Sequence, residues 1–119
     1  MIRGIRGAIT ATSNTSEDIL SSTEKLLSEV VRQNSIKTDD IASIIFTLSP
    51  DLNAVFPAEA ARKMGWSFVP LLCASEINVP GGLQKCIRIL MHVNTGKKPN
   101  EINHIYLEGA KVLREEFSA

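Results

Sequence analysis

Residues 2–34, IRGIRGAITATSNTSEDILSSTEKLLSEVVRQN, decide the fold because they predict a strand followed by one long helix. Over residues 2–10 the side chains alternate, with apolar ones on one face and Arg6 between Gly4 and Ala8 on the other. Over residues 19–31 apolar side chains recur at helical spacing, and charged ones occupy the opposite side. The chain therefore starts as a strand leading into a helix that can cover one face of a sheet.

Both ends of this helix carry sequence signals. Thr15, with Asp18 three positions later, resembles a capping box at the start of the helix. Asn34 tolerates the left-handed conformation that is often found just beyond a helix end. These signals predict a helix that begins after the polar turn at residues 13–16 and ends near Asn34.

Shorter elements fill the rest of the chain. The pattern after Gly81-Gly82 also fits a helix, but its β-branched residues favour a strand. The predicted elements are a strand over 44–48, a short helix over 57–63, and strands over 66–73, 86–93 and 104–107. This order predicts an α/β (α+β) fold in one domain over residues 1–119, with a mobile tail from about residue 115. One long helix covers one face of a mixed sheet, so we expect a second copy of the chain to cover the other.

The charge balance and the cysteines limit the partners and the location. The 119 residues include 13 basic and 13 acidic side chains, so the formal net charge is zero. General binding to nucleic acid or to an anionic membrane needs a surplus of Lys and Arg, so we expect neither. The start of the chain is unlike a secretory leader, and no apolar run is long enough to span a bilayer. Cys73 and Cys86 lack metal or redox spacing, so we expect a cytoplasmic protein with free thiols and no metal.

Several polar groups interrupt apolar segments and are candidates for a site. They are Arg6, Glu76, Arg88, Tyr106 and Arg114. Each also has an ordinary structural explanation, since a strand arginine is commonly a solvated charge and a tyrosine is commonly half-buried with its hydroxyl in water. By the same reasoning Arg62 is a surface charge, and Cys73 is a small buried hydrophobe. Periodicity alone does not choose between these explanations and a functional site.

Nearly the whole chain, from Ile2 to Arg114, resembles the small monofunctional chorismate mutases of the AroH class. Four ordered blocks carry the resemblance: IRGIRGA (2–8), SPDLNAVFPA (49–58), GGLQKCIR (81–88) and HIYLE (104–108). The resemblance implies a homotrimeric pseudo-α/β barrel in which each subunit contributes a mixed five-stranded sheet and active sites lie between adjacent subunits. It also implies the Claisen rearrangement of chorismate to prephenate, with no cofactor, metal or covalent intermediate.

The resemblance also assigns roles to individual residues. Arg88 matches an arginine that donates to the ether oxygen and a carboxylate of the substrate, while Arg6 and Tyr106 match groups that hold a carboxylate. Glu76 and Cys73 match groups near the ring hydroxyl. The remaining matches are an apolar wall and two peripheral cations: Phe56, Ala58, Leu72 and Leu113 in the wall, and Arg62 and Arg114 as the cations.

The chain departs from the family pattern at several positions, two of which are close to the residues named above. Glu59 stands where a lysine is expected, and Leu72 replaces a small polar residue beside Cys73.

Two rival functions are a non-catalytic trimeric module that binds a small carboxylate and a purely structural oligomer. The presence of Arg6, Glu76, Arg88 and Tyr106 together favours the enzyme, because a binding module has no need for a group at the ether oxygen.

Overall fold

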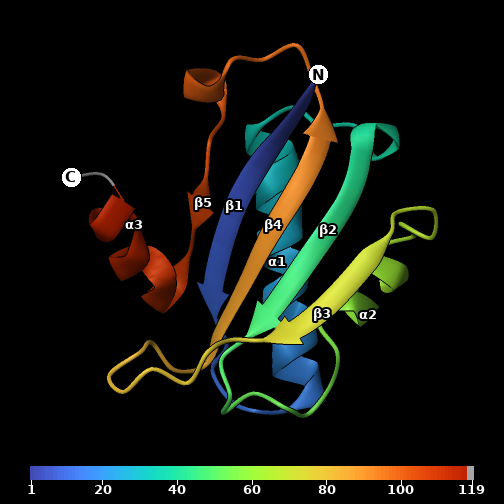
Figure 1. Cartoon of the computed structure of the whole chain (residues 1–119). Helices are drawn as coiled ribbons and strands as arrows, with labels where there is room; N and C mark the ends of the chain where they lie inside the picture. Colours follow the sequence, from blue (N-terminus) through green and yellow to red (C-terminus); the bar gives the residue numbers. More distant parts are fainter. Residues whose placement is uncertain (118–119) are drawn as a thin grey trace.

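A long helix packed on a mixed sheet organises the computed structural model, which describes residues 1–117 of the chain (Figure 1). The strands lie in the order β3-β2-β4-β1-β5. Their bounds are β1 (Ile2–Thr10), β2 (Ile41–Leu48), β3 (Leu71–Ser75), β4 (Cys86–Asn94) and β5 (Ile105–Tyr106). The helices are α1 (Ser16–Gln33), α2 (Ala58–Lys63) and α3 (Lys111–Phe117), with short 3-10 turns at Thr38–Asp40, Pro99–Glu101 and Glu108–Ala110. The predicted α+β fold, a mixed sheet with one long helix, is confirmed.

The central strand, β4, runs antiparallel to both of its neighbours, β1 and β2. The two outer pairs, β1 with β5 and β2 with β3, are parallel. Because parallel neighbours need a crossover, the chain passes through α2 between β2 and β3. The sheet therefore has two different edges, with β3 and α2 at one and β5 and α3 at the other (Figure 1).

The core lies between α1 and one face of the sheet. Leu26, Leu27 and Val30 of α1 are fully buried, as are Ile5 and Phe46 on the strands. Gly7 of β1 lets the helix approach closely: a Cβ there would lie 3.0 Å from Ile89 Cγ1 and 3.2 Å from Leu26 Cδ1. The predicted alternation of residues 2–10 is therefore confirmed, because the face opposite Arg6 packs under the helix.

The other face of the sheet is not covered by α1, and near β5 it is covered in part by Leu113 of α3, which packs with Ala8. Register places Tyr106, Ala8, Arg88, Thr47 and Ala74 in one row across this face. The adjacent row contains Arg6, Leu90, Ile45 and Leu72. Leu72 is 61% exposed and Leu90 36%, so apolar side chains lie open to solvent here. We call this surface the open face.

Three local predictions need correction. The strand placed over 66–73 begins only at Leu71, because Gly65 (φ +84°) leads Trp66 into a turn where its N–H donates to the Ala61 carbonyl at 3.0 Å. The left-handed residue after α1 is Ser35 (φ 52°), whereas Asn34 has φ −108° and is buried. The sequence also failed to predict α3, since a charged seven-residue segment has too few turns for a clear apolar stripe.

The C-terminal tail was expected to be mobile from about residue 115. Residues as far as Phe117 belong to α3, and Arg114 lies exposed within it. The remainder of that prediction concerns residues 118–119, which lie outside the described residues.

Candidate active site

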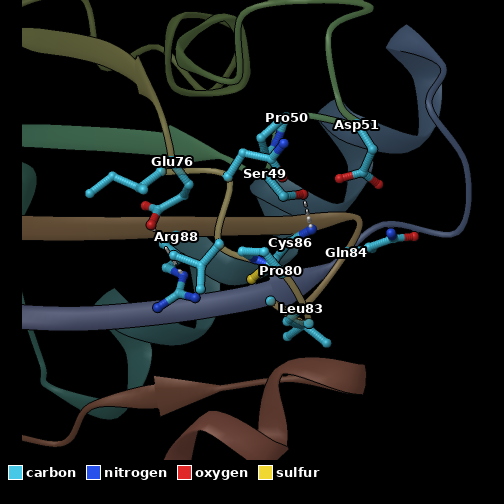
Figure 2. Close-up of a pocket in the computed structure, with 14 residues that line it drawn as sticks. Ser49, Pro50, Asp51, Glu76, Pro80, Leu83, Gln84, Cys86 and Arg88 are labelled. Atoms are coloured by element: carbon cyan, nitrogen blue, oxygen red, sulfur yellow. Dashed lines mark hydrogen bonds and ion pairs between the residues drawn. The ribbon is translucent and has the colours of Figure 1, made fainter.

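A cleft of about 480 Å³ opens at one end of the sheet, where β2 ends and β4 begins (Figure 2). Its walls are the turn after β2, the loop over residues 76–84 and the first residues of β4. Arg88 and Glu76 both line it. These two were predicted as site residues from segments 12 positions apart, and the fold brings them together.

Arg88 has a buried donor that no group of the described residues satisfies. Its Nε is buried and, among the described residues, has no hydrogen-bond partner. Glu76 Oε1 lies 3.9 Å away, close enough for an ion pair and too far for a hydrogen bond. Figure 2 shows the Glu76 carboxylate directed toward the guanidinium, so the two charges face each other in the cleft. A buried donor without an acceptor is costly, and a ligand oxygen in the cleft would relieve that cost.

Backbone hydrogen bonds hold the two walls of the cleft in place. The Glu76 N–H donates to the Leu48 carbonyl at 2.8 Å, which fixes the carboxylate beside the end of β2. The Cys86 N–H donates to Ser49 Oγ at 2.8 Å, and the Ser49 N–H donates back to the Cys86 carbonyl at 2.9 Å. Asp51 accepts from the Lys85 N–H at 2.8 Å. The cleft is therefore preformed around Arg88.

The Cys86 thiol is a neutral group in this wall. Burial raises the pKa of Cys86, while the nearby Arg88 charge acts in the opposite direction to a smaller extent. Cys86 packs with Ala8, Ala110 and Leu113 in a small apolar cluster. We therefore assign the thiol to packing, since a protonated thiol is not a nucleophile.

Tyr106 and Leu113 lie next to Arg88 on the open face. Tyr106 is paired with Ala8, and Ala8 is paired with Arg88, so only a methyl group stands between the two longer side chains in this row. Leu113 of α3 is 5% exposed and belongs to the apolar cluster against which Tyr106 packs. Arg6 stands in the adjacent row. Tyr106, Arg88, Glu76 and Leu113 thus lie toward one end of the sheet, and Arg6 lies in the row beside Tyr106 and Arg88.

The other predicted residues, except Arg114, belong to the β3 edge of the sheet or to the segment around α2. Phe56 is 70% exposed in the loop before α2, and Ala58 is buried in the first turn of that helix. Arg62 forms an ion pair with Glu59 one turn back on α2. Leu72 is exposed on the open face, whereas Cys73 is paired with Phe46 and packs against the core. A second hollow, of about 610 Å³, lies at this edge and is lined by Phe56 and Cys73 among others.

The outermost members of these two groups lie far apart within one chain. β3 and β5 are four strand spacings apart, roughly 19 Å, although Glu76 directly follows β3. Arg114, exposed on α3, belongs to the β5 edge. A site that used residues of both edges, such as Phe56 and Tyr106, would need a second copy to bring them together.

The structure adds residues to the site that the sequence analysis missed. Ser49 was read only as part of a loop, and His104 only as the start of a strand. Their contacts with Cys86 and Arg6 join positions 37 and 98 residues apart, so no local pattern could reveal them.

Among the described residues, no group of three His, Cys, Asp or Glu side chains is arranged to hold a metal ion. The helices of the described chain are all too short or too polar to cross a membrane.

Comparisons with known proteins agree with this architecture. The family model described as chorismate mutase type I matches residues 2–117. The chain is 46% identical to chorismate mutase AroH of Bacillus subtilis over 119 residues, covering 99% of this chain and 94% of that protein. It is 43% identical to chorismate mutase AroH of Thermus thermophilus over 120 residues, covering 100% and 98%.

A solved structure, the chorismate mutase from Clostridium thermocellum, is 55% identical in sequence and superposes with a TM-score of 0.91. The likeness covers 92% of this chain and 98% of that one. The fold and the cleft define an α+β protein with a preformed cleft in which Arg88 faces Glu76. The chain belongs to the type I chorismate mutases.

Proposed function

We propose that this chorismate mutase, an isomerase of aromatic amino acid biosynthesis, converts chorismate to prephenate in the cleft around Arg88. The observation that carries the proposal is the buried Arg88 Nε, which has no hydrogen-bond acceptor among the described residues and faces a cleft beside a carboxylate. A ligand with an oxygen at this point would complete the site. The sequence resemblance assigns that oxygen to the ether of chorismate.

The reaction suits such a site because it is a unimolecular rearrangement. Breaking of the ether bond runs ahead of bond making, so negative charge grows on the ether oxygen and positive charge on the ring. Arg88 keeps its charge and can donate to two acceptors, so it would stabilise the oxygen in the transition state more than in the ground state. Glu76, on the other side of the cleft, would face the electron-poor ring. No electron, proton or group needs to be supplied, so the proposal involves no cofactor and no covalent intermediate.

The remaining residues would bind and enclose the substrate. Arg6 and Tyr106 would hold a substrate carboxylate, and their rows on the open face place them beside Arg88. Cys73 would lie near the ring hydroxyl. The apolar wall would consist of Phe56, Ala58, Leu72 and Leu113, with Arg62 and Arg114 as peripheral cations. Holding the compact conformer of chorismate between these groups would lower the entropic part of the barrier.

We also propose a homotrimer in which each active site lies between two subunits. The α2–β3 edge of one copy would meet the β5 edge of the next and bring Phe56, Ala58 and Arg62 to the cleft around Arg88. Such a contact joins two different surfaces, so repeating it around an axis can close a ring. The exposed apolar side chains of the open face support burial against other copies. Three copies is the number that the family resemblance implies.

The location proposed for the enzyme is the cytoplasm. Cys73 and Cys86 are both free, which suits a reducing compartment. Labelling of the thiols in intact cells with a membrane-permeant but not with an impermeant reagent tests this location.

The proposal is tested by following the loss of chorismate absorbance with the purified protein. Arg88→Ala should lower kcat at least about 100-fold, as expected for the loss of one transition-state donor. Arg32→Ala is the matched control, because Arg32 also pairs with a glutamate but lies on α1, and its rate should stay within about twofold of wild type. A wild-type rate at the uncatalysed background, or a near-normal Arg88→Ala rate, would contradict the proposal.

A second experiment separates charge from shape and enzyme from binding module. Citrulline at position 88 keeps the planar fork without the positive charge, so it should remain close to Arg88→Ala in kcat. Calorimetry with a bicyclic oxa-dicarboxylate that mimics the transition state distinguishes the rival functions. Binding together with turnover supports the enzyme, binding alone supports a carboxylate-binding module, and no binding supports a structural oligomer.

A further inference from the structure

The His104 side chain accepts a hydrogen bond from β1 at a position where, in a longer β5 strand, a backbone carbonyl would accept it. On β1, the Ala8 carbonyl accepts from the Leu107 N–H at 2.9 Å, as a member of the parallel ladder with β5. Two residues earlier, the Arg6 N–H donates to His104 Nδ1 at 2.9 Å. β5 begins only at Ile105, so the imidazole extends the β1–β5 ladder by one hydrogen bond.

The backbone just before His104 is anchored from the other side by the end of α1. The Asn103 N–H donates to Asn34 Oδ1 at 2.8 Å, and Asn34 Nδ2 donates to the Asn103 carbonyl at 2.8 Å. Asn103 Nδ2 also donates to the Gln33 carbonyl at 3.0 Å. Since Asn34 is 1% exposed and also donates to the Val30 carbonyl, this anchor is rigid. The ring is thus held between α1 and β1, and the strand that follows it carries Tyr106.

We propose that His104 is a positioning residue of the reaction: its neutral ring holds the Arg6 backbone, and with it β5, so that Arg6 and Tyr106 meet a substrate carboxylate. This inference rests on the function proposed above for Arg6 and Tyr106. The contact requires Nδ1 without a proton, so the ring carries its proton on Nε2. A second proton on the ring would set a donor against the Arg6 donor and break the contact.

The electrostatic surroundings keep the ring neutral near pH 7. Burial, followed by the positive charge of Arg6 on the adjacent strand, lowers the pKa of His104 from its ordinary value of 6.5. The contact is therefore present above pH 6.5 and is lost as the pH falls through the pKa of His104 in the folded chain, which lies below 6.5. A loss of substrate binding in this acid range is the expected signature.

Two substitutions at position 104 distinguish the role of the hydrogen-bond acceptor from that of the titrating imidazole ring. His104→Leu removes the side-chain acceptor that holds the Arg6 N–H, so KM should rise about fivefold to tenfold while kcat changes less. His104→Asn offers Oδ1 near the position of Nδ1 and does not titrate, so it should restore KM to within about threefold of wild type. Its kcat/KM should also lose the fall that wild type shows below pH 6.5.

His92→Asn is the control for the pH profile, because His92 is the other histidine of the chain and contacts Ser43 on β2. It should keep the acid fall. Three results would each overturn the role of His104. The first is a fall of kcat/KM below pH 6.5 that persists in His104→Asn, and the second is the disappearance of that fall in His92→Asn. The third is a His104→Leu enzyme with the KM of wild type. An inactive wild type would instead refute the proposed function.

An NMR experiment tests the contact independently of activity. The chemical shift of the Arg6 amide proton should change with pH as His104 titrates, and a chemical shift that does not change with pH would overturn the contact itself.

Discussion

Replacing Gly7 by alanine tests the contact that sets the distance between α1 and the sheet. The new Cβ would lie 3.0 Å from Ile89 Cγ1, 3.2 Å from Leu26 Cδ1 and 3.3 Å from Ile89 Cδ1. All three distances are below ordinary van der Waals contact, and all three atoms belong to residues buried between helix and sheet. The neighbours cannot move outward without disturbing a close-packed core.

The expected cost is that of overpacking, about 1–3 kcal/mol in the free energy of unfolding. For a chain of this size that corresponds to a fall in Tm of about 4–15 °C. Because Gly7 lies between Arg6 and Ala8, a shift of β1 should also lower the rate of chorismate conversion. Urea unfolding followed by circular dichroism at one fixed protein concentration measures the cost, since oligomerisation would make stability depend on concentration.

Two further variants identify the cause. Gly96→Ala is the matched control: nothing lies within 4 Å of its added Cβ, so it should be neutral or stabilising by less than about 1 kcal/mol. Ile89→Ala removes both of the Ile89 atoms that the new methyl would meet, so the double variant Gly7→Ala/Ile89→Ala should lose less stability than the sum of the single changes. Strictly additive losses, or a Gly7→Ala protein as stable as wild type, would refute the steric explanation.

Two other predictions concern the start of α1 and the open face. Thr15→Ala removes the oxygen that accepts the Asp18 N–H at 3.2 Å, so urea unfolding should show a loss of about 1 kcal/mol, while Ser28→Ala at an exposed position within the helix should show none. Leu90→Asp places a charge in the centre of the open face, where Leu90 is 36% exposed, and light scattering should report dissociation of the proposed trimer with the helical signal of the chain retained. An unchanged mass for Leu90→Asp would argue against burial of this face between copies.

Local patterns in the sequence were enough to predict most of the elements. The strand over residues 2–10 and the long helix were predicted correctly because alternation and helical spacing are properties of neighbouring residues. The Thr15 cap is equally local. By contrast, the segment around Trp66 was wrongly predicted to be a strand. Trp66 is buried against α2 and the core and is not paired with a neighbouring strand.

The roles of the site residues came from resemblance, and their grouping came from the fold. Periodicity gave no reason to prefer Arg88 over other arginines, because a strand arginine is usually solvated. What distinguishes Arg88 is a buried Nε that has no acceptor in the described part of the chain and a carboxylate at 3.9 Å, and both depend on the loop over residues 76–84 returning to β4. The split of the predicted site between two edges of the sheet likewise follows from the strand order.

Patterns among neighbouring residues were enough to predict which residues alternate, which form the helix and which face of β1 is buried. The meeting of distant groups, including Arg88 with Glu76 and the Arg6 amide with His104, depends on how the whole chain packs. The two kinds of information differ in range. Periodicity and capping act over a few residues, whereas pairing across a sheet depends on the free energy of the whole packed chain, to which the short sequence around each residue contributes only a part.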